Sequence, residues 1–187
     1  MLWIDFINSD YHDWRGGNRS EDRLDRSGWL AELLSHYRLA ADEPHPDELD
    51  RLKQLRTLLF SIVKRHVGGD RPDQEMIAAL NLVLAQGAFV SQVDTDGETY
   101  TLRQAPSANG WPQAMSAIAS SFADMLASGG ASRIRMCDNP DCRWIYYDET
   151  RNRSKRYCDD KMCGNLMKVR RFRARHKATA EAPLTES

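Results

Sequence analysis

The stretch CDNPDCRWIYYDETRNRSKRYCDDKMCGNLMKVRRFRARHK, residues 137–177, contains all four cysteines of the 187-residue chain. They form two pairs, Cys137 with Cys142 and Cys158 with Cys163, with four residues inside each pair and fifteen between the pairs. Zn²⁺ prefers four thiolate or imidazole ligands in a tetrahedron, and two short cysteine-bearing turns supply them. The spacing therefore predicts one zinc ion held by all four thiolates. Because four protein ligands leave no position open for water, the zinc is expected to be structural.

Two disulfides are the alternative for the same four cysteines. The chain begins with a short apolar patch that has Asp5 and Asp10 nearby and no basic lead, which is unlike a secretory signal. A cytoplasmic location is therefore expected, and its reducing conditions favour metal binding over disulfides. No apolar run approaches the roughly 20 residues of a membrane span, so no membrane partner is expected.

The residues around the cysteines predict a small folded unit. Residues 138–141 (DNPD) favour a turn, and Arg143–Tyr147 reads as a strand that leaves the metal. Arg156–Cys158 is predicted to return as the second strand of a hairpin. A helix with an apolar side and many basic residues is predicted from Gly164 or Asn165 to about Lys177. Knuckle, hairpin and helix in this order are typical of a treble-clef zinc finger.

A family resemblance follows from the same residues. Residues 135–175 resemble the CGNR-type zinc finger in the two cysteine pairs, the aromatic run Trp144–Tyr147, the lead-in Arg156–Cys158 and the motif Cys163–Asn165. One position differs, because Leu166 stands where the family has its namesake arginine. The resemblance implies the C-terminal module of a bacterial protein whose N-terminal domain is of the ABATE type. Such proteins are described as stress-induced transcription regulators.

The charge of the chain is distributed unevenly. The whole chain has a net charge of −1, but residues 133–177 contain 14 Lys and Arg against 6 Asp and Glu. Residues 1–132 contain 12 against 19. Zinc with four thiolates lowers the charge of the finger by two, which leaves it strongly basic. Some cations neutralise the zinc centre, but the excess predicts a polyanionic partner such as DNA.

The N-terminal part is predicted to be mainly helical with one β-hairpin, so the whole chain belongs to the α+β class. Apolar residues at helical spacing, with proline and glycine at the ends, predict helices over 27–39, from about 47 to Gly68, from Pro72 to Gly87 and from Pro112 to Gly129. Residues 88–93 and 98–104 read as the hairpin. Leu2–Ile7 is too short to assign. The predicted divisions are an ABATE-type domain (1–130), the zinc finger (133–177) and a disordered tail (178–187).

Three polar residues resemble recurring positions of the ABATE-type pattern, namely Asn8, Arg56 and Asn81. The resemblance implies a sensory role for this domain, and the three side chains are candidates for lining a pocket for an unknown small molecule. The alternative is an exposed arginine and an interior asparagine with its hydrogen bonds satisfied. Nothing else in residues 1–132 identifies a ligand.

The leading functional hypothesis is a zinc-finger transcription regulator that binds DNA. The candidate phosphate contacts are the basic residues of the predicted hairpin loop and helix: Arg151, Arg153, Lys155, Arg156, Lys168, Arg170, Arg171, Arg173 and Arg175. One small finger reads few base pairs, which favours a homodimer or a second contact. The alternative is a zinc-stabilised interaction or dimerisation protein that does not bind DNA. No catalytic motif surrounds any of the five histidines, so an enzyme is not expected.

Overall fold

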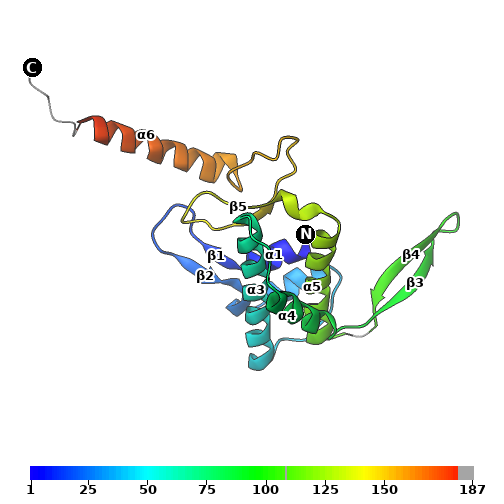
Figure 1. The fold of residues 1–187 in the computed structure, drawn as a ribbon. Helices are drawn as coiled ribbons and strands as arrows, with labels where there is room; N and C mark the ends of the chain where they lie inside the picture. The colour runs from blue at the N-terminus through cyan, green and yellow to red at the C-terminus, as the bar shows by residue number, and fades with distance from the viewer. Residues whose placement is uncertain (108, 181–187) are drawn as a thin grey trace, which may run out of the picture.

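The computed structural model describes residues 1–107 and 109–180, and its N-terminal body is helical (Figure 1). The helices of the body are α1 (Leu2–Ile7), α2 (Trp29–His36), α3 (Pro46–Val67), α4 (Gln74–Leu84) and α5 (Trp111–Ala127). No helix among the described residues is long and apolar enough to cross a membrane. The predicted tail falls partly outside the description, because residues 181–187 are not described and residues 178–180 continue the last helix.

Helix α3 is the central element of the body, and its sequence explains where it begins and how it packs. Pro46 occupies the first turn, and the Glu48 side chain accepts a hydrogen bond from the His45 N–H at 2.8 Å, which caps the start. Its apolar stripe is buried against α1 and α5, where Trp3 and Phe122 meet edge-on with ring centroids 5.1 Å apart. The predicted helices are therefore present, and the unassigned segment at the N-terminus is helix α1.

Among the described residues, the strands form three separate antiparallel pairs. They are β1 (Asp10–His12) with β2 (Ser20–Asp22), β3 (Phe89–Thr95) with β4 (Tyr100–Pro106), and β5 (Ile134–Met136) with β6 (Ile145–Tyr147). The predicted hairpin is β3–β4, which projects from the body as an arm (Figure 1). Its turn lies two residues later than expected, because Asp96 accepts hydrogen bonds from the N–H groups of Glu98 and Thr99.

The zinc-finger region contains one error of the sequence prediction. Strand β6 pairs with β5, which precedes the first cysteine, whereas Arg156–Cys158 forms no strand. The reason is the buried Asp148, whose carboxylate accepts hydrogen bonds from Thr150 and from the backbone N–H of Lys155. These bonds hold residues 148–155 as a closed loop. The returning chain then runs along the first cysteine turn, where the Asp138 N–H donates to the Arg156 carbonyl at 2.9 Å.

The finger and the helical body share one hydrophobic core. Ile134 of β5 and Ile145 of β6 are 1% and 0% exposed, and both belong to the same buried cluster as α1, α3 and α5. The chain then passes through a π-helical turn, η3 (Asp160–Gly164), into α6 (Asn165–Ala180), which projects away from the body (Figure 1). Helices with small antiparallel sheets and a four-cysteine cluster confirm the predicted α+β class.

Candidate metal centre and nucleic-acid interface

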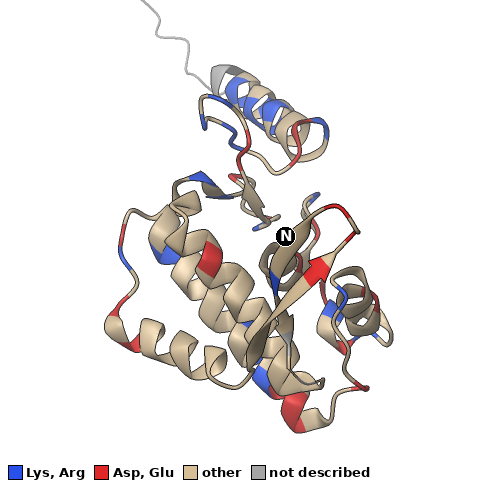
Figure 2. Cartoon of the chain, turned by 90° about the vertical axis from the view of Figure 1, so that its right-hand side faces the viewer, with Lys and Arg blue, Asp and Glu red and all other residues tan. Residues whose placement is uncertain are grey.

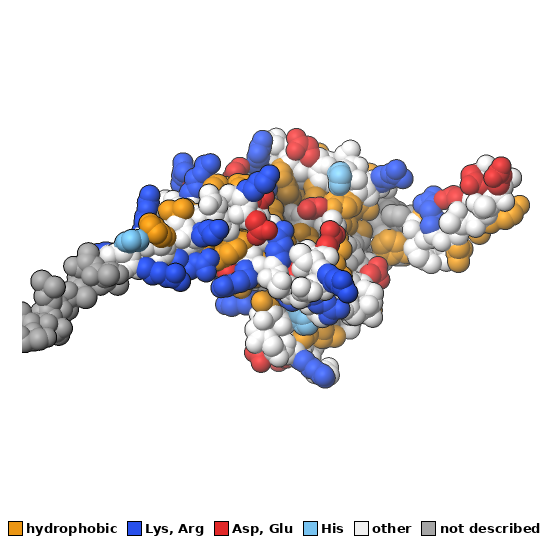
Figure 3. Space-filling model, turned by 90° about the horizontal axis from the view of Figure 1, so that it is seen from above, with side chains coloured by type: hydrophobic (Ala, Val, Ile, Leu, Met, Phe, Trp, Pro, Cys, Tyr) orange, Lys and Arg blue, Asp and Glu red, His pale blue; other side chains and the backbone are white. Residues whose placement is uncertain are grey.

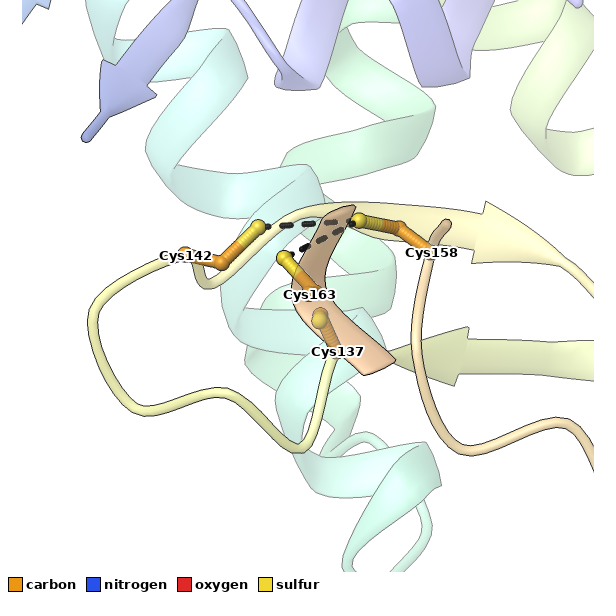
Figure 4. A group of neighbouring side chains, drawn as sticks. All are labelled: Cys137, Cys142, Cys158 and Cys163. Atoms are coloured by element: carbon orange, nitrogen blue, oxygen red, sulfur yellow. Dashed lines mark hydrogen bonds between the residues drawn. The ribbon is translucent and has the colours of Figure 1, made fainter. Parts of the chain in front are cut away.

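The four cysteines converge on one point from separate parts of the chain (Figure 4). All four Sγ atoms lie within 4.8 Å of one another. The Sγ atoms of Cys142 and Cys158 are 3.7 Å apart, and those of Cys158 and Cys163 are 3.8 Å apart. A tetrahedral site with Zn–S bonds of about 2.3 Å has sulfur atoms about 3.8 Å from one another. The donor set and its spacing therefore fit a single tetrahedral zinc ion.

Backbone hydrogen bonds shape the two turns that carry the cysteines. In the first, the Cys142 N–H donates to the Asn139 carbonyl at 3.0 Å, and the Cys137 N–H donates to the Trp144 carbonyl at 2.9 Å. In the second, the Asp159 side chain accepts from the Met162 N–H at 2.7 Å and caps η3. These hydrogen bonds hold the cysteines of each turn in position around the site.

Close packing drives the pKa values of the four thiols apart. The neighbouring thiols of Cys142 and Cys158 stabilise the Cys137 thiolate, which lowers the pKa of Cys137 to about 2. The neighbouring Cys137 thiolate raises the pKa of Cys142 to about 12 and also raises the pKa of Cys158. Burial raises the pKa of Cys163. A divalent cation at the centre offsets the repulsion between thiolates, so that all four bind as S⁻.

Asn139 connects the metal centre to the helical body. Its side chain is fully buried, and its Nδ2 donates to the Trp14 carbonyl at 2.7 Å and toward the Cys163 Sγ at 3.4 Å. An N–H directed at a metal-bound sulfur stabilises its negative charge. Sequence reasoning assigned residue 139 only to a turn, because nothing local indicates that its side chain reaches a residue 125 positions away.

The loop between β1 and β2 supplies the other side of this contact. The carboxylate of Asp13 accepts the Arg15 N–H at 3.0 Å and the Arg19 guanidinium at 2.6 and 2.9 Å. The hydrogen bond from the Arg15 N–H and the neighbouring guanidinium of Arg19 together hold the pKa of Asp13 below its usual value. The loop is therefore held in one shape, with the Trp14 and Arg15 carbonyls turned toward the finger.

Arg170 of α6 closes the contact between loop and finger. Its guanidinium donates to the Asp141 carboxylate at 2.5 Å and to the Arg15 carbonyl at 2.8 Å. Gly16 has φ +78°, and a Cβ atom there would lie only 2.8 Å from the Arg170 Nη2. The left-handed backbone conformation favours glycine at this position. Arg170 anchors the first turns of α6 to the body.

Asn8 forms a second link between the body and the finger. Its side chain is 4% exposed, with Nδ2 donating to the Ile145 carbonyl at 2.8 Å and Oδ1 accepting the Ile145 N–H at 2.9 Å. An asparagine amide used in this way imitates a strand partner for β6. Both of its polar atoms are therefore engaged inside the protein.

The other two candidate ligand residues are placed differently. Arg56 forms a two-pronged ion pair with Asp22, at 2.6 Å for each bond, and also donates to the Ser9 hydroxyl at 2.9 Å. Asn81 is exposed on α4. The contacts of Asn8 and Arg56 are structural, so the hypothesis of a pocket lined by all three residues gains no support.

The nine candidate DNA-contacting residues separate into two groups. Four are engaged within the protein. Arg153 donates to the Ser132 hydroxyl, Arg156 pairs with Asp138 at 2.6 Å, Lys155 lies over the Tyr146 ring, and Arg170 is the anchor described above. The other five are exposed, as are Arg153 and Arg156: they are Arg151 in the loop after β6 and Lys168, Arg171, Arg173 and Arg175 on α6. Arg171 and Arg175 also have contacts within the protein.

The fold and the site define a helical protein that carries a four-cysteine zinc finger on a shared core. Residues 1–129 match the sequence model of the ABATE family, described as "Putative stress-induced transcription regulator", and residues 133–176 match that of the CGNR zinc finger. The chain belongs to the ABATE family and carries a CGNR zinc finger with one structural zinc ion. A comparison with curated proteins finds no match.

Proposed function

We propose that this protein regulates transcription by binding duplex DNA through helix α6. The charge of α6 is the observation that carries this proposal. The helix contains six Lys and Arg residues and no Asp or Glu (Figure 2). Helices of this composition attract the phosphates of DNA. The zinc ion holds the finger in shape and takes no part in a reaction, so the proposal assigns no catalytic step.

The spacing of the cations on α6 also favours a polyanion. Lys168, Arg171 and Arg175 follow one another at intervals of three and four residues, and so lie on the same side of the helix. Like charges at this spacing destabilise an isolated helix. Phosphate groups placed beside them would replace this repulsion with attraction. Binding to DNA is therefore expected to stabilise α6.

We expect the double substitution Lys168→Ala, Arg171→Ala to weaken binding to any DNA duplex by roughly 10- to 100-fold at about 0.1 M salt, because each lost phosphate contact removes about 0.9 from the log–log salt slope. A plot of the logarithm of the binding constant against the logarithm of the salt concentration should have a slope of about −4 to −6 for the wild-type protein. The slope for the variant should be less negative by about two. Fluorescence anisotropy with a labelled duplex over a series of salt concentrations measures both quantities. Alanine keeps the helix intact, since it is the best helix former.

A matched control removes two exposed cations from the helical body. Arg51 and Lys64 both lie on the solvent side of α3, so their joint replacement by alanine changes the net charge equally. This control should leave the salt slope nearly unchanged. A salt slope near zero for the wild-type protein, or equal losses in both double variants, would contradict the proposed role of α6.

The proposal includes a sensory role for the helical body, as its family membership suggests. A cavity of about 390 Å³ opens between α2, the segment before α3 and the start of α5. Leu30, Leu34 and Trp111 form part of its wall, and Asp25 and Glu43 supply negative charge at it. Asn8 and Arg170 join the body to the finger, so a ligand held in the body would act on α6 through these contacts.

The free thiols that zinc requires are consistent with the reducing cytoplasm.

A specific observation also favours the alternative function, a protein-interaction or dimerisation role. On one face of the β3–β4 arm, Val93, Tyr100 and Leu102 are 64%, 82% and 70% exposed. Isolated two-stranded hairpins are only marginally stable in water. An uncovered apolar face on such a hairpin is typical of a contact surface, and a second copy of the chain is the simplest occupant.

If the arm mediates self-association, the double substitution Val93→Thr, Leu102→Thr should convert a dimer to a monomer, because it replaces apolar surface with hydroxyl groups. Threonine favours strands, so the hairpin itself should be retained. Light scattering coupled to size-exclusion chromatography gives the mass. The control Gln92→Thr lies on the opposite face of the arm and should leave the mass unchanged. A monomeric wild-type protein would rule out this role for the arm. Dimerisation without retention on DNA would favour the alternative function over the main proposal.

A further inference from the structure

Helix α6 carries an exposed apolar ridge as well as its positive charge. The ridge consists of Val169, Phe172 and His176, which follow one another at intervals of three and four residues. Val169 is 39% exposed and Phe172 is 62% exposed. The rings of Phe172 and His176 are in contact, with centroids 4.2 Å apart. The three side chains therefore form one continuous strip on the surface.

Basic residues line both sides of this ridge. Helical spacing places Lys168, Arg171 and Arg175 along one side and Arg173 and Lys177 along the other. Figure 3 shows this arrangement, with hydrophobic and histidine side chains along α6 between lysine and arginine side chains. The charge therefore flanks the ridge on two sides instead of forming a single basic face.

The ridge is not needed to pack the zinc finger. Three other aromatic residues of the finger, Trp144, Tyr146 and Tyr157, pack into the cluster around the cysteines. Phe172 lies two residues after the anchoring residue Arg170 on α6, and α6 projects from the body (Figure 1). A mostly exposed phenylalanine on a protruding helix costs solubility. Its position is explained if it contacts a partner.

We infer that the ridge enters the major groove of duplex DNA, with Phe172 against the methyl groups of thymine bases and the two basic rows on the phosphates of the two strands. The major groove is about 12 Å wide and admits one α-helix, so both walls of the groove face the helix at once. Cations on two sides of an apolar strip match that geometry, whereas a helix lying on one strand needs only one basic face. The inference rests on the proposed DNA binding and adds the groove and the residue that reads bases.

The test compares two short alternating duplexes that differ only in the thymine methyl group, one of dA and dT and one of dA and dU. The wild-type protein should bind the dT duplex about three- to tenfold more tightly, because each contacted methyl group adds apolar burial. Phe172→Ala should bind both duplexes equally and keep the wild-type salt slope. The control Leu82→Ala removes a side chain of similar exposure on α4, 70%, and should keep the preference for dT.

Three other results would overturn the inference, and they differ in what they say about the proposed function. Equal binding of both duplexes by wild type and Phe172→Ala, with a steep salt slope, would exclude base contact but leave DNA binding in place. No binding to either duplex would end both the inference and the proposed function. Binding to phosphatidylserine vesicles that requires Phe172, without a preference between duplexes, would assign the ridge to a membrane surface.

Discussion

Replacing Cys163 with serine is expected to remove the zinc ion and unfold the finger. Structural zinc contributes about 10–16 kcal/mol in zinc-finger peptides, more than a small module gains from its own core. Cys163 is 1% exposed, so water cannot reach the introduced serine hydroxyl to take the place of the lost ligand. The zinc content measured by elemental analysis should fall from one zinc per chain to near none, and circular dichroism should show the loss of helix α6.

The helical body should also lose stability when the zinc is removed. Ile134 and Ile145 belong to the core of the body, and the finger holds the strands that carry them. Thermal unfolding of the variant, or of the wild-type protein treated with a chelator, should therefore begin at a lower temperature. Acid should act in the same direction, because protonated thiols do not bind zinc.

Met162 offers a control in the same turn. It is adjacent to Cys163 in the sequence, but its side chain is 42% exposed and it is not one of the four cysteine ligands. Met162→Ala should retain one zinc per chain and a nearly unchanged melting temperature. Full zinc retention in Cys163→Ser would show that the four sulfur atoms do not act as one site.

The second large effect is expected for Asn8→Ala, which should destabilise the protein by about 2–5 kcal/mol. The substitution leaves both the N–H and the carbonyl of Ile145 buried without a partner, and each such group costs about 1–3 kcal/mol. For a chain of this size the melting temperature should fall by roughly 5–15 °C. Urea denaturation monitored by circular dichroism measures the loss of free energy.

Two further substitutions distinguish this structural role from ligand binding. Asn8→Asp keeps the acceptor but directs a carboxylate at the Ile145 carbonyl, so its destabilisation should decrease as the pH falls and the acid becomes a donor. Asn81→Ala, at an exposed helical position, should change stability by less than about 0.5 kcal/mol. If Asn8→Ala were as stable as wild type without any ligand, the link between body and finger would be wrong.

The zinc site could be predicted from the sequence because its signals are local. Each cysteine pair lies within a six-residue turn, and the soft donors leave few alternatives once they converge. The helices were predictable for the same reason, since the apolar period and the terminal Pro and Gly residues act over a few residues. The paired strands of the finger were not. Pairing depended on the buried Asp148 and on Ile134 before the first cysteine, and no local pattern indicates either.

The sequence by itself thus determined the metal ligands, the helical class of the body and the basic character of the finger. Tertiary structure decided which polar side chains remain exposed. Of the cations predicted to contact DNA, Arg170 is held by Asp141 and the Arg15 carbonyl, and Arg156 pairs with Asp138 at the surface. The buried Asn8 links the body to β6. The physical reason is that a buried polar group must find a partner wherever the fold places one. That partner is often more than a hundred residues away, as Ile145 is from Asn8.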